Sequence, residues 1–115
     1  MEIDILHSLE KPDLFEKFKT QLTKDFELCG LLDDAPQINS NELNHVFSEL
    51  LKSIRLLENK GANGLMNLLY RIDVTESQIN QAVKLNPDKT WQEVIAELII
   101  KRILQKVIFK EKYPN

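Results

Sequence analysis

The chain has few of the residues that form disulfides, bind metals or break helices. Its 115 residues include one cysteine, two histidines, three glycines and four prolines. The single cysteine, Cys29, excludes a disulfide within the chain and fits a reducing compartment. The acidic N-terminus has neither the basic start nor the apolar stretch of a secretion signal, and no apolar run reaches the length of a membrane span. We therefore expect a cytoplasmic protein without membrane contact.

The composition favours a small helical domain. A chain of this length has room for one domain, and its 43% of hydrophobic residues can supply a core. Leucine is more frequent than isoleucine, valine or threonine, which favours helices over strands. The sequence predicts an all-α fold over residues 1–115, a compact bundle of about five helices with a long C-terminal helix. Residues 1–11 are an N-terminal arm for which the pattern leaves two alternatives, a short helix or an extended segment docked on the core.

Apolar residues at helical spacing locate the individual helices. Pro12 suits the first turn of a helix, and Gly30 suits the position just past its end. Pairs with Ser, Thr or Asn followed three residues later by Glu or Gln are typical of the capping boxes that begin helices. Such pairs occur at Asn39 and Glu42, at Thr75 and Gln78, and at Thr90 and Glu93. The predicted helices span residues 12–29, 40–60, 64–72, 76–85 and 90–112.

The last predicted helix carries apolar residues on two sides. Near its start they share the side of Trp91, but after Ile99 they lie roughly half a turn away. One interpretation is that other helices of the same chain cover both sides, since a helix that is apolar nearly all round is usually buried. Alternatively, the second half packs against another chain, because a small domain cannot easily cover so long an apolar segment.

The second of these interpretations gives the functional hypothesis. An exposed stripe of large aliphatic residues needs a partner, and a second copy related by two-fold symmetry is the simplest one. We therefore expect a protein–protein interaction or adaptor domain that self-associates through its C-terminal helix. The predicted interface residues are Ile99, Ile100, Ile103, Leu104, Val107, Ile108 and Phe109, with Tyr113 as a further aromatic anchor at the rim.

No combination of residues predicts catalysis, a cofactor or a metal site. Glu42 and His45 have the spacing used in di-iron carboxylate bundles, but such a site needs a second pair. Both residues also fall opposite the apolar side of their helix, where they should face water. Cys29 lies on the apolar side of its helix, which is typical of a structural thiol. We therefore expect a non-catalytic protein, and no small-molecule substrate is evident.

Nucleic-acid binding is one alternative function. Residues 75–109 have the order helix, turn, longer helix that is found in helix-turn-helix proteins. However, the second of these helices begins with Trp91 and Glu93, where a recognition helix presents groups that contact bases and phosphates. A net charge of −3 also disfavours a polyanionic partner. Nucleic acid is therefore an unlikely partner.

A small acidic inhibitor of the immunity type is the other alternative. Acidic residues predominate in the first half of the chain and could steer it towards a basic protein. No motif singles out this function. The acidic residues that would provide the steering charge are Glu2, Asp4, Glu10, Asp13, Asp33 and Asp34.

Overall fold

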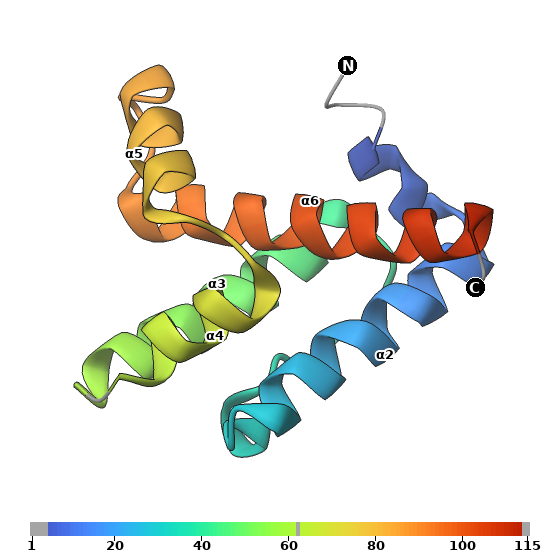
Figure 1. Ribbon diagram of the computed structural model, residues 1–115, viewed down its shortest axis with the longest axis horizontal. Helices are drawn as coiled ribbons and strands as arrows, with labels where there is room; N and C mark the ends of the chain where they lie inside the picture. The colour runs from blue at the N-terminus through green and yellow to red at the C-terminus, as the bar shows by residue number, and fades with distance from the viewer. Residues whose placement is uncertain (1–4, 62, 114–115) are drawn as a thin grey trace.

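The computed structural model describes residues 5–61 and 63–113. Within these ranges the chain forms five α-helices and two short 3-10 helices, so the predicted all-α fold is confirmed (Figure 1). The α-helices are α2 (Pro12–Leu28), α3 (Leu43–Asn59), α4 (Gly64–Ile72), α5 (Glu76–Leu85) and α6 (Trp91–Lys112); the 3-10 helices are η1 (His7–Glu10) and η2 (Leu32–Asp34).

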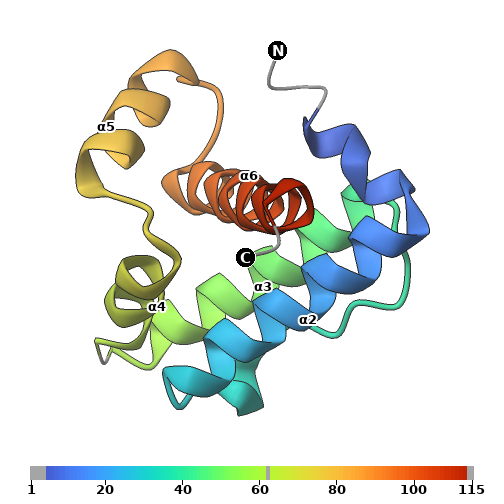
Figure 2. The ribbon, with the colours of Figure 1, turned by 45° about the vertical axis from the view of Figure 1, so that its right-hand side comes forward.

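The long helix α6 lies at the centre of the structure. It contacts α2, α3, α4 and α5. In Figure 2, which shows α6 nearly along its axis, α2 and α3 lie beneath it and α5 lies to one side. Helices of the same chain therefore cover α6 from more than one side, which explains why its apolar residues are not confined to a single stripe. Its buried residues are Val94, Ile95, Ala96, Ile99, Ile100, Ile103, Leu104 and Val107.

Helix α2 contributes the aromatic part of the core. Phe15, Phe18, Leu22 and Phe26 are buried and recur at intervals of three or four residues, so they share one side of the helix. Each such side chain contributes about 1.5–3 kcal/mol relative to leaving it exposed. Pro12 stands in the first turn, as predicted.

Two of the three predicted capping boxes are present. At the start of α5, the Thr75 hydroxyl accepts a hydrogen bond from the Gln78 backbone at 3.1 Å, and the Gln78 side chain accepts one from the Thr75 backbone at 2.9 Å. Thr90 and Glu93 form the same reciprocal pair at the start of α6, at 3.2 and 2.8 Å. These bonds satisfy backbone donors that the first turn of a helix leaves unpaired.

The third predicted box is wrong. Helix α3 begins at Leu43, later than predicted, and Glu42 occupies the cap position without a side-chain hydrogen bond. The Asn39 backbone instead donates to Nε2 of His45 at 3.0 Å. This contact holds residues 39–42 as an extended approach to the helix, so Asn39 cannot serve as its cap.

A sharp corner separates α4 from α5. Asp73 adopts a left-handed conformation with φ of 75°, which ends α4 and redirects the chain. The next residue, Val74, is buried in the core, and Thr75 then caps α5. The corner sends α5 away from α4 and towards the first half of α6 (Figure 1).

None of the described helices combines the length and apolar character that a bilayer crossing requires.

Candidate functional site

The structure corrects the interface predicted on α6. Most of the proposed interface residues lie in the core, where α2 and α3 pack against α6, so another chain cannot dock on them. Of the predicted interface residues, those at the end of the helix keep apolar surface: Ile108 is half-buried and Phe109 is 63% exposed. The predicted interface residues that the core encloses are Ile99, Ile100, Ile103, Leu104 and Val107.

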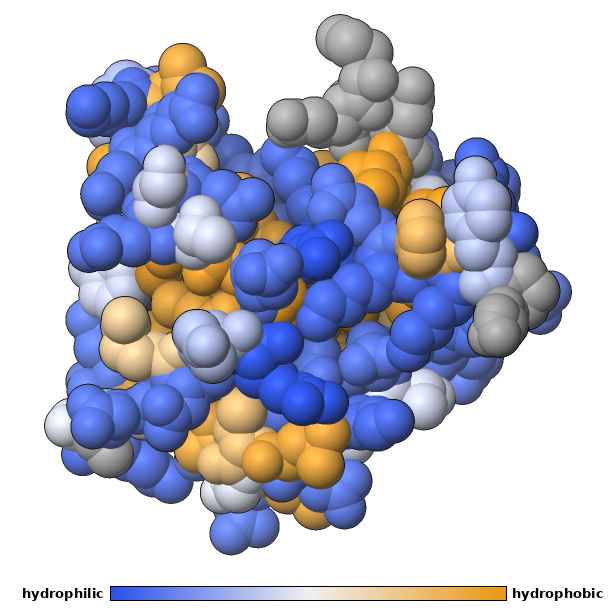
Figure 3. Space-filling view, viewed as in Figure 1, coloured by the Kyte–Doolittle hydropathy of each residue, from blue (hydrophilic) through white to orange (hydrophobic). Residues whose placement is uncertain are grey.

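An apolar groove of about 490 Å³ lies between α4 and α5, and we call it the α4–α5 groove. The space-filling view shows apolar side chains exposed in the hollow between these two helices (Figure 3). Residues of α4, of the corner, of α5 and of the first turns of α6 line it: Leu65, Met66, Leu69, Tyr70, Asp73, Val74, Thr75, Glu76, Ile79, Asn80, Trp91 and Ile95.

The groove combines a buried apolar base with exposed side chains of α4. Leu69 and Ile95 are buried, whereas Met66 is 65% and Tyr70 is 89% exposed. Met66 and Tyr70 are four residues apart, so they occupy the same side of the helix, away from its core side. Trp91, the first residue of α6, lines the groove and is also exposed. Large apolar and aromatic groups therefore gather at one surface site.

The charged residues of the groove are acidic. Among the described residues that line it, Asp73 and Glu76 are carboxylates and none is cationic. Asp73 Oδ2 accepts a hydrogen bond from Nη2 of Arg102 at 3.2 Å, whereas Glu76 is exposed and has no ion pair in the described part of the chain. The groove is therefore apolar within and negative at its edge.

The groove exists because α5 is only partly packed. Helix α5 has no buried residue, and its apolar side chains Ile79, Ala82 and Val83 are half-buried. It packs mainly on α6. A second hollow of about 350 Å³ lies along α5 and α6, where Leu85 and Leu98 line it. Helix α5 thus packs on α6 and lines a hollow on each of two sides, the α4–α5 groove and this second hollow.

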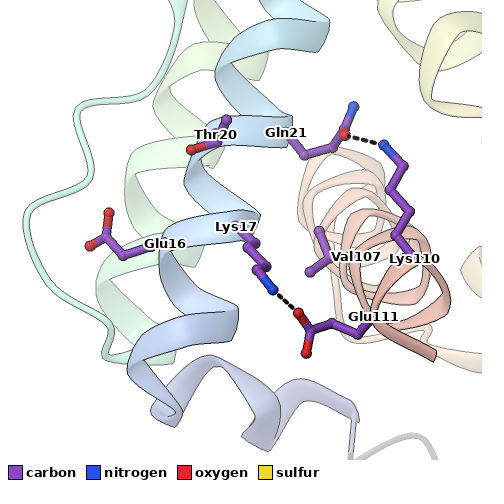
Figure 4. Close-up of a pocket in the computed structure, with 7 residues that line it drawn as sticks. All are labelled: Glu16, Lys17, Thr20, Gln21, Val107, Lys110 and Glu111. Atoms are coloured by element: carbon purple, nitrogen blue, oxygen red, sulfur yellow. Dashed lines mark hydrogen bonds and ion pairs between the residues drawn. The ribbon is translucent and has the colours of Figure 1, made fainter. Parts of the chain in front are cut away.

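A further cavity of about 380 Å³ separates α2 from the end of α6. Figure 4 shows two polar contacts that join the helices across it. Lys17 forms an ion pair with Glu111, and Nζ of Lys110 donates to Oε1 of Gln21 at 3.1 Å. These contacts connect α2 to the end of α6, so we regard the cavity as part of the helix packing and not as a binding site.

A buried carboxylate on α2 binds a side chain of α4, and the backbone of α4 is in turn hydrogen-bonded to α6. Asp25 on α2 is 1% exposed, and its Oδ1 accepts hydrogen bonds from Nε2 of Gln21 at 3.1 Å and from Nε of Arg71 at 3.4 Å. Nζ of Lys106 donates to the Arg71 carbonyl at 3.5 Å. Burial lowers the pKa of Lys106, and the negative charge of Asp25 partly offsets this effect. Asp25 lines neither the α4–α5 groove nor the α2–α6 cavity, which points to a structural role.

The residues considered for a metal site, Glu42 and His45, and the only thiol, Cys29, have contacts that fit structural roles. In the described ranges, no group of three or more His, Cys, Asp or Glu residues could hold a metal ion. His45 accepts the backbone hydrogen bond from Asn39, and Glu42 is exposed. Cys29 is half-buried, and its Sγ lies 3.7 Å from the Asn67 carbonyl, to which it donates. Burial raises the pKa of the thiol, with Arg71 opposing part of the shift, so the thiol stays protonated and a poor nucleophile.

The central position of α6 bears on the helix-turn-helix alternative. A recognition helix must leave its outer side free to enter the major groove of DNA. In the first turns of α6, the three consecutive residues Val94, Ile95 and Ala96 are buried, so neighbouring helices cover more than one side of it there. This packing counts against α6 as a recognition helix.

The acidic residues proposed for an immunity-type surface are dispersed. Glu2 and Asp4 lie outside the described residues. Asp34 is buried and paired with Nζ of Lys60 at 2.8 Å, so its charge is largely neutralised. Glu10, Asp13 and Asp33 remain exposed on three separate elements. This distribution does not single out an acidic docking surface.

No family model, curated protein or solved structure matches this chain. The interpretation of the α4–α5 groove therefore depends on its own geometry and chemistry. Catalytic pockets typically bring reactive or ionisable groups, such as a nucleophile or an acid–base pair, together at one point. The groove has an apolar base, exposed aromatic side chains and an acidic edge, which are properties of a surface that binds another protein.

Proposed function

We propose that the protein is a non-catalytic protein–protein interaction domain of the cytoplasm that binds its partner in the α4–α5 groove. The observation that carries this proposal is the exposure of Met66 and Tyr70 beside a buried apolar base. Clustered exposed apolar residues mark interaction sites on small domains, and tyrosine and tryptophan are frequent anchors in interfaces. The lone, protonated thiol of Cys29 is consistent with a reducing compartment.

The chemistry of the groove favours an amphipathic helix with basic residues as the partner segment. Two helices form the long sides of the groove, and an apolar helix face packs well into such a site. Glu76, which has no ion pair among the described residues, would attract lysine or arginine residues beside that face and disfavour acidic ones. A groove of about 490 Å³ holds only a few side chains, so we expect weak and reversible binding.

Trp91 provides a direct test, because it lines the groove and is the only tryptophan in the chain. The probe is a tryptophan-free amphipathic helical peptide with a leucine face flanked by lysines. A matched peptide carries glutamates in place of the lysines. We expect the basic peptide to produce a saturable blue shift of the Trp91 emission, since its leucines exclude water from the indole. The acidic peptide should bind more weakly.

Two protein variants locate the binding site. Tyr70→Lys removes an aromatic anchor and places a positive charge in the groove that repels the lysines of the basic peptide, so we expect it to weaken binding by roughly tenfold or more. Leu56→Lys changes an exposed leucine of α3 that lies outside the groove, and should leave the affinity unchanged. The proposal fails if the basic peptide does not bind, if both peptides bind equally, or if Tyr70→Lys binds as well as the wild type.

A further inference from the structure

We propose that the partner helix is the end of α6 from a second copy of this chain. This inference rests on the proposed function of the α4–α5 groove. Phe109 and Tyr113, near the end of α6, are 63% and 64% exposed, and their ring centroids lie 4.9 Å apart. We call the segment from Ile108 to Tyr113 the α6 tip. The α6 tip exposes aromatic side chains at the end of a helix. Such a surface could fill the apolar groove, which has no partner among the residues that the structure describes.

The charges of the α6 tip complement those of the groove. Lys110 and Lys112 are exposed, and Lys112 has no ion pair among the described residues. The one carboxylate of the tip, Glu111, is already paired with Lys17. The tip therefore presents aromatic groups with positive charge, whereas Glu76 gives the groove negative charge. Such complementarity favours the contact over a groove–groove or tip–tip pairing.

The tip and the groove cannot meet within one chain. Trp91 at the start of α6 lines the groove, and the tip lies about 26 to 33 Å away, at the other end of the same 22-residue helix. In Figure 1, α4 and α5 lie beside the first half of α6 at the left, and the C-terminal end of α6 lies at the right, at the opposite end of the helix. A contact between tip and groove must therefore join two copies.

Complementary variants test this contact by sedimentation velocity. Tyr70→Lys disables the groove and Phe109→Glu disables the tip, and both residues are exposed, so each variant should fold, as circular dichroism will verify. The wild type should increase in mass from low to high micromolar concentration, and each variant alone should stay monomeric. A mixture of the two should associate again, because it contains one intact groove and one intact tip.

Fluorescence of the mixture identifies the site. The Tyr70→Lys protein additionally carries Trp91→Phe, so that the only tryptophan belongs to the intact groove of the Phe109→Glu protein. We expect a saturable blue shift of that tryptophan on mixing. Leu56→Lys is the matched control and should associate as the wild type does.

Several results would overturn the inference: a wild type that is monomeric at high micromolar concentration, self-association that persists in either single variant, or a mixture that stays monomeric. The peptide titration separates this failure from that of the proposed function. If the basic peptide binds the groove while copies of the chain stay apart, the interaction function stands and its partner is another protein. If the peptide also fails to bind, both proposals are wrong.

Discussion

Helices α5 and α6 follow one another in the chain and begin with the same kind of capping box, yet their surroundings differ completely. Helix α6 buries residues along most of its length, whereas α5 has no buried residue. The boxes at Thr75 and Thr90 have nearly the same geometry. A cap thus determines where a helix begins, but the neighbouring helices determine how much of it is buried and how strongly it is held.

The amino-acid content of the two helices explains the difference. Helix α6 has large aliphatic side chains on two sides, so packing helices on both sides of it removes much apolar surface from water. Helix α5 has Ile79, Ala82 and Val83 on one side, and its last residue, Leu85, is mostly exposed. Elements with few buried contacts open locally at low free energy. Helix α5 is therefore the part of the structure best able to adjust around a bound helix.

Matched truncations in the two helices should have the most unequal effects. Ile103→Ala removes a fully buried side chain of α6 and should lower the free energy of unfolding by about 2–5 kcal/mol. Leu85→Ala removes an exposed side chain of α5 and should change it by less than about 0.5 kcal/mol. Urea unfolding followed by circular dichroism measures both. Equal losses in the two variants would show that α5 is packed as firmly as α6.

Removal of the two helix caps should change stability less than the core truncation, but it should show more directly that α5 opens separately from α6. Thr75→Ala and Thr90→Ala each delete a cap worth about 1 kcal/mol. We expect Thr90→Ala to lower the global free energy of unfolding by that amount, because α6 unfolds only with the whole core. Thr75→Ala should mainly accelerate amide hydrogen exchange in α5, because that helix can open by itself. If Thr75→Ala also accelerates exchange throughout α6, the two helices unfold as one unit.

Local features of the fold could be predicted from the sequence, because they depend on neighbours in the chain. The boxes at Thr75 and Thr90 and the apolar spacing in α2 gave the correct helices. The box at Asn39 was wrong, because the backbone of Asn39 is engaged by the side chain of His45. Composition and spacing do not reveal which local hydrogen bond a polar side chain will prefer.

The candidate site could not be predicted, because it depends on contacts between distant segments. The apolar residues around Ile103 left two interpretations open, cover by helices of the same chain or by a partner chain, and the sequence does not show that α2 and α3 provide that cover. The α4–α5 groove combines residues of three helices and the corner at Asp73. One signal was present: Met66 and Tyr70 share a side of α4 that its core residues do not occupy. That side faces a groove only because α5 is directed away from α4.

The central claim is that the docking surface lies in the α4–α5 groove and at the α6 tip, and not on the enclosed stripe of α6. Amide and indole NMR spectra of the wild type at increasing concentration test it most directly. We predict progressive shifts for the Trp91 indole, for Tyr70 and Glu76, and for Phe109, while Ile103 stays unchanged. Shifts centred on α2 and α3, or spectra that do not change with concentration, would contradict the account.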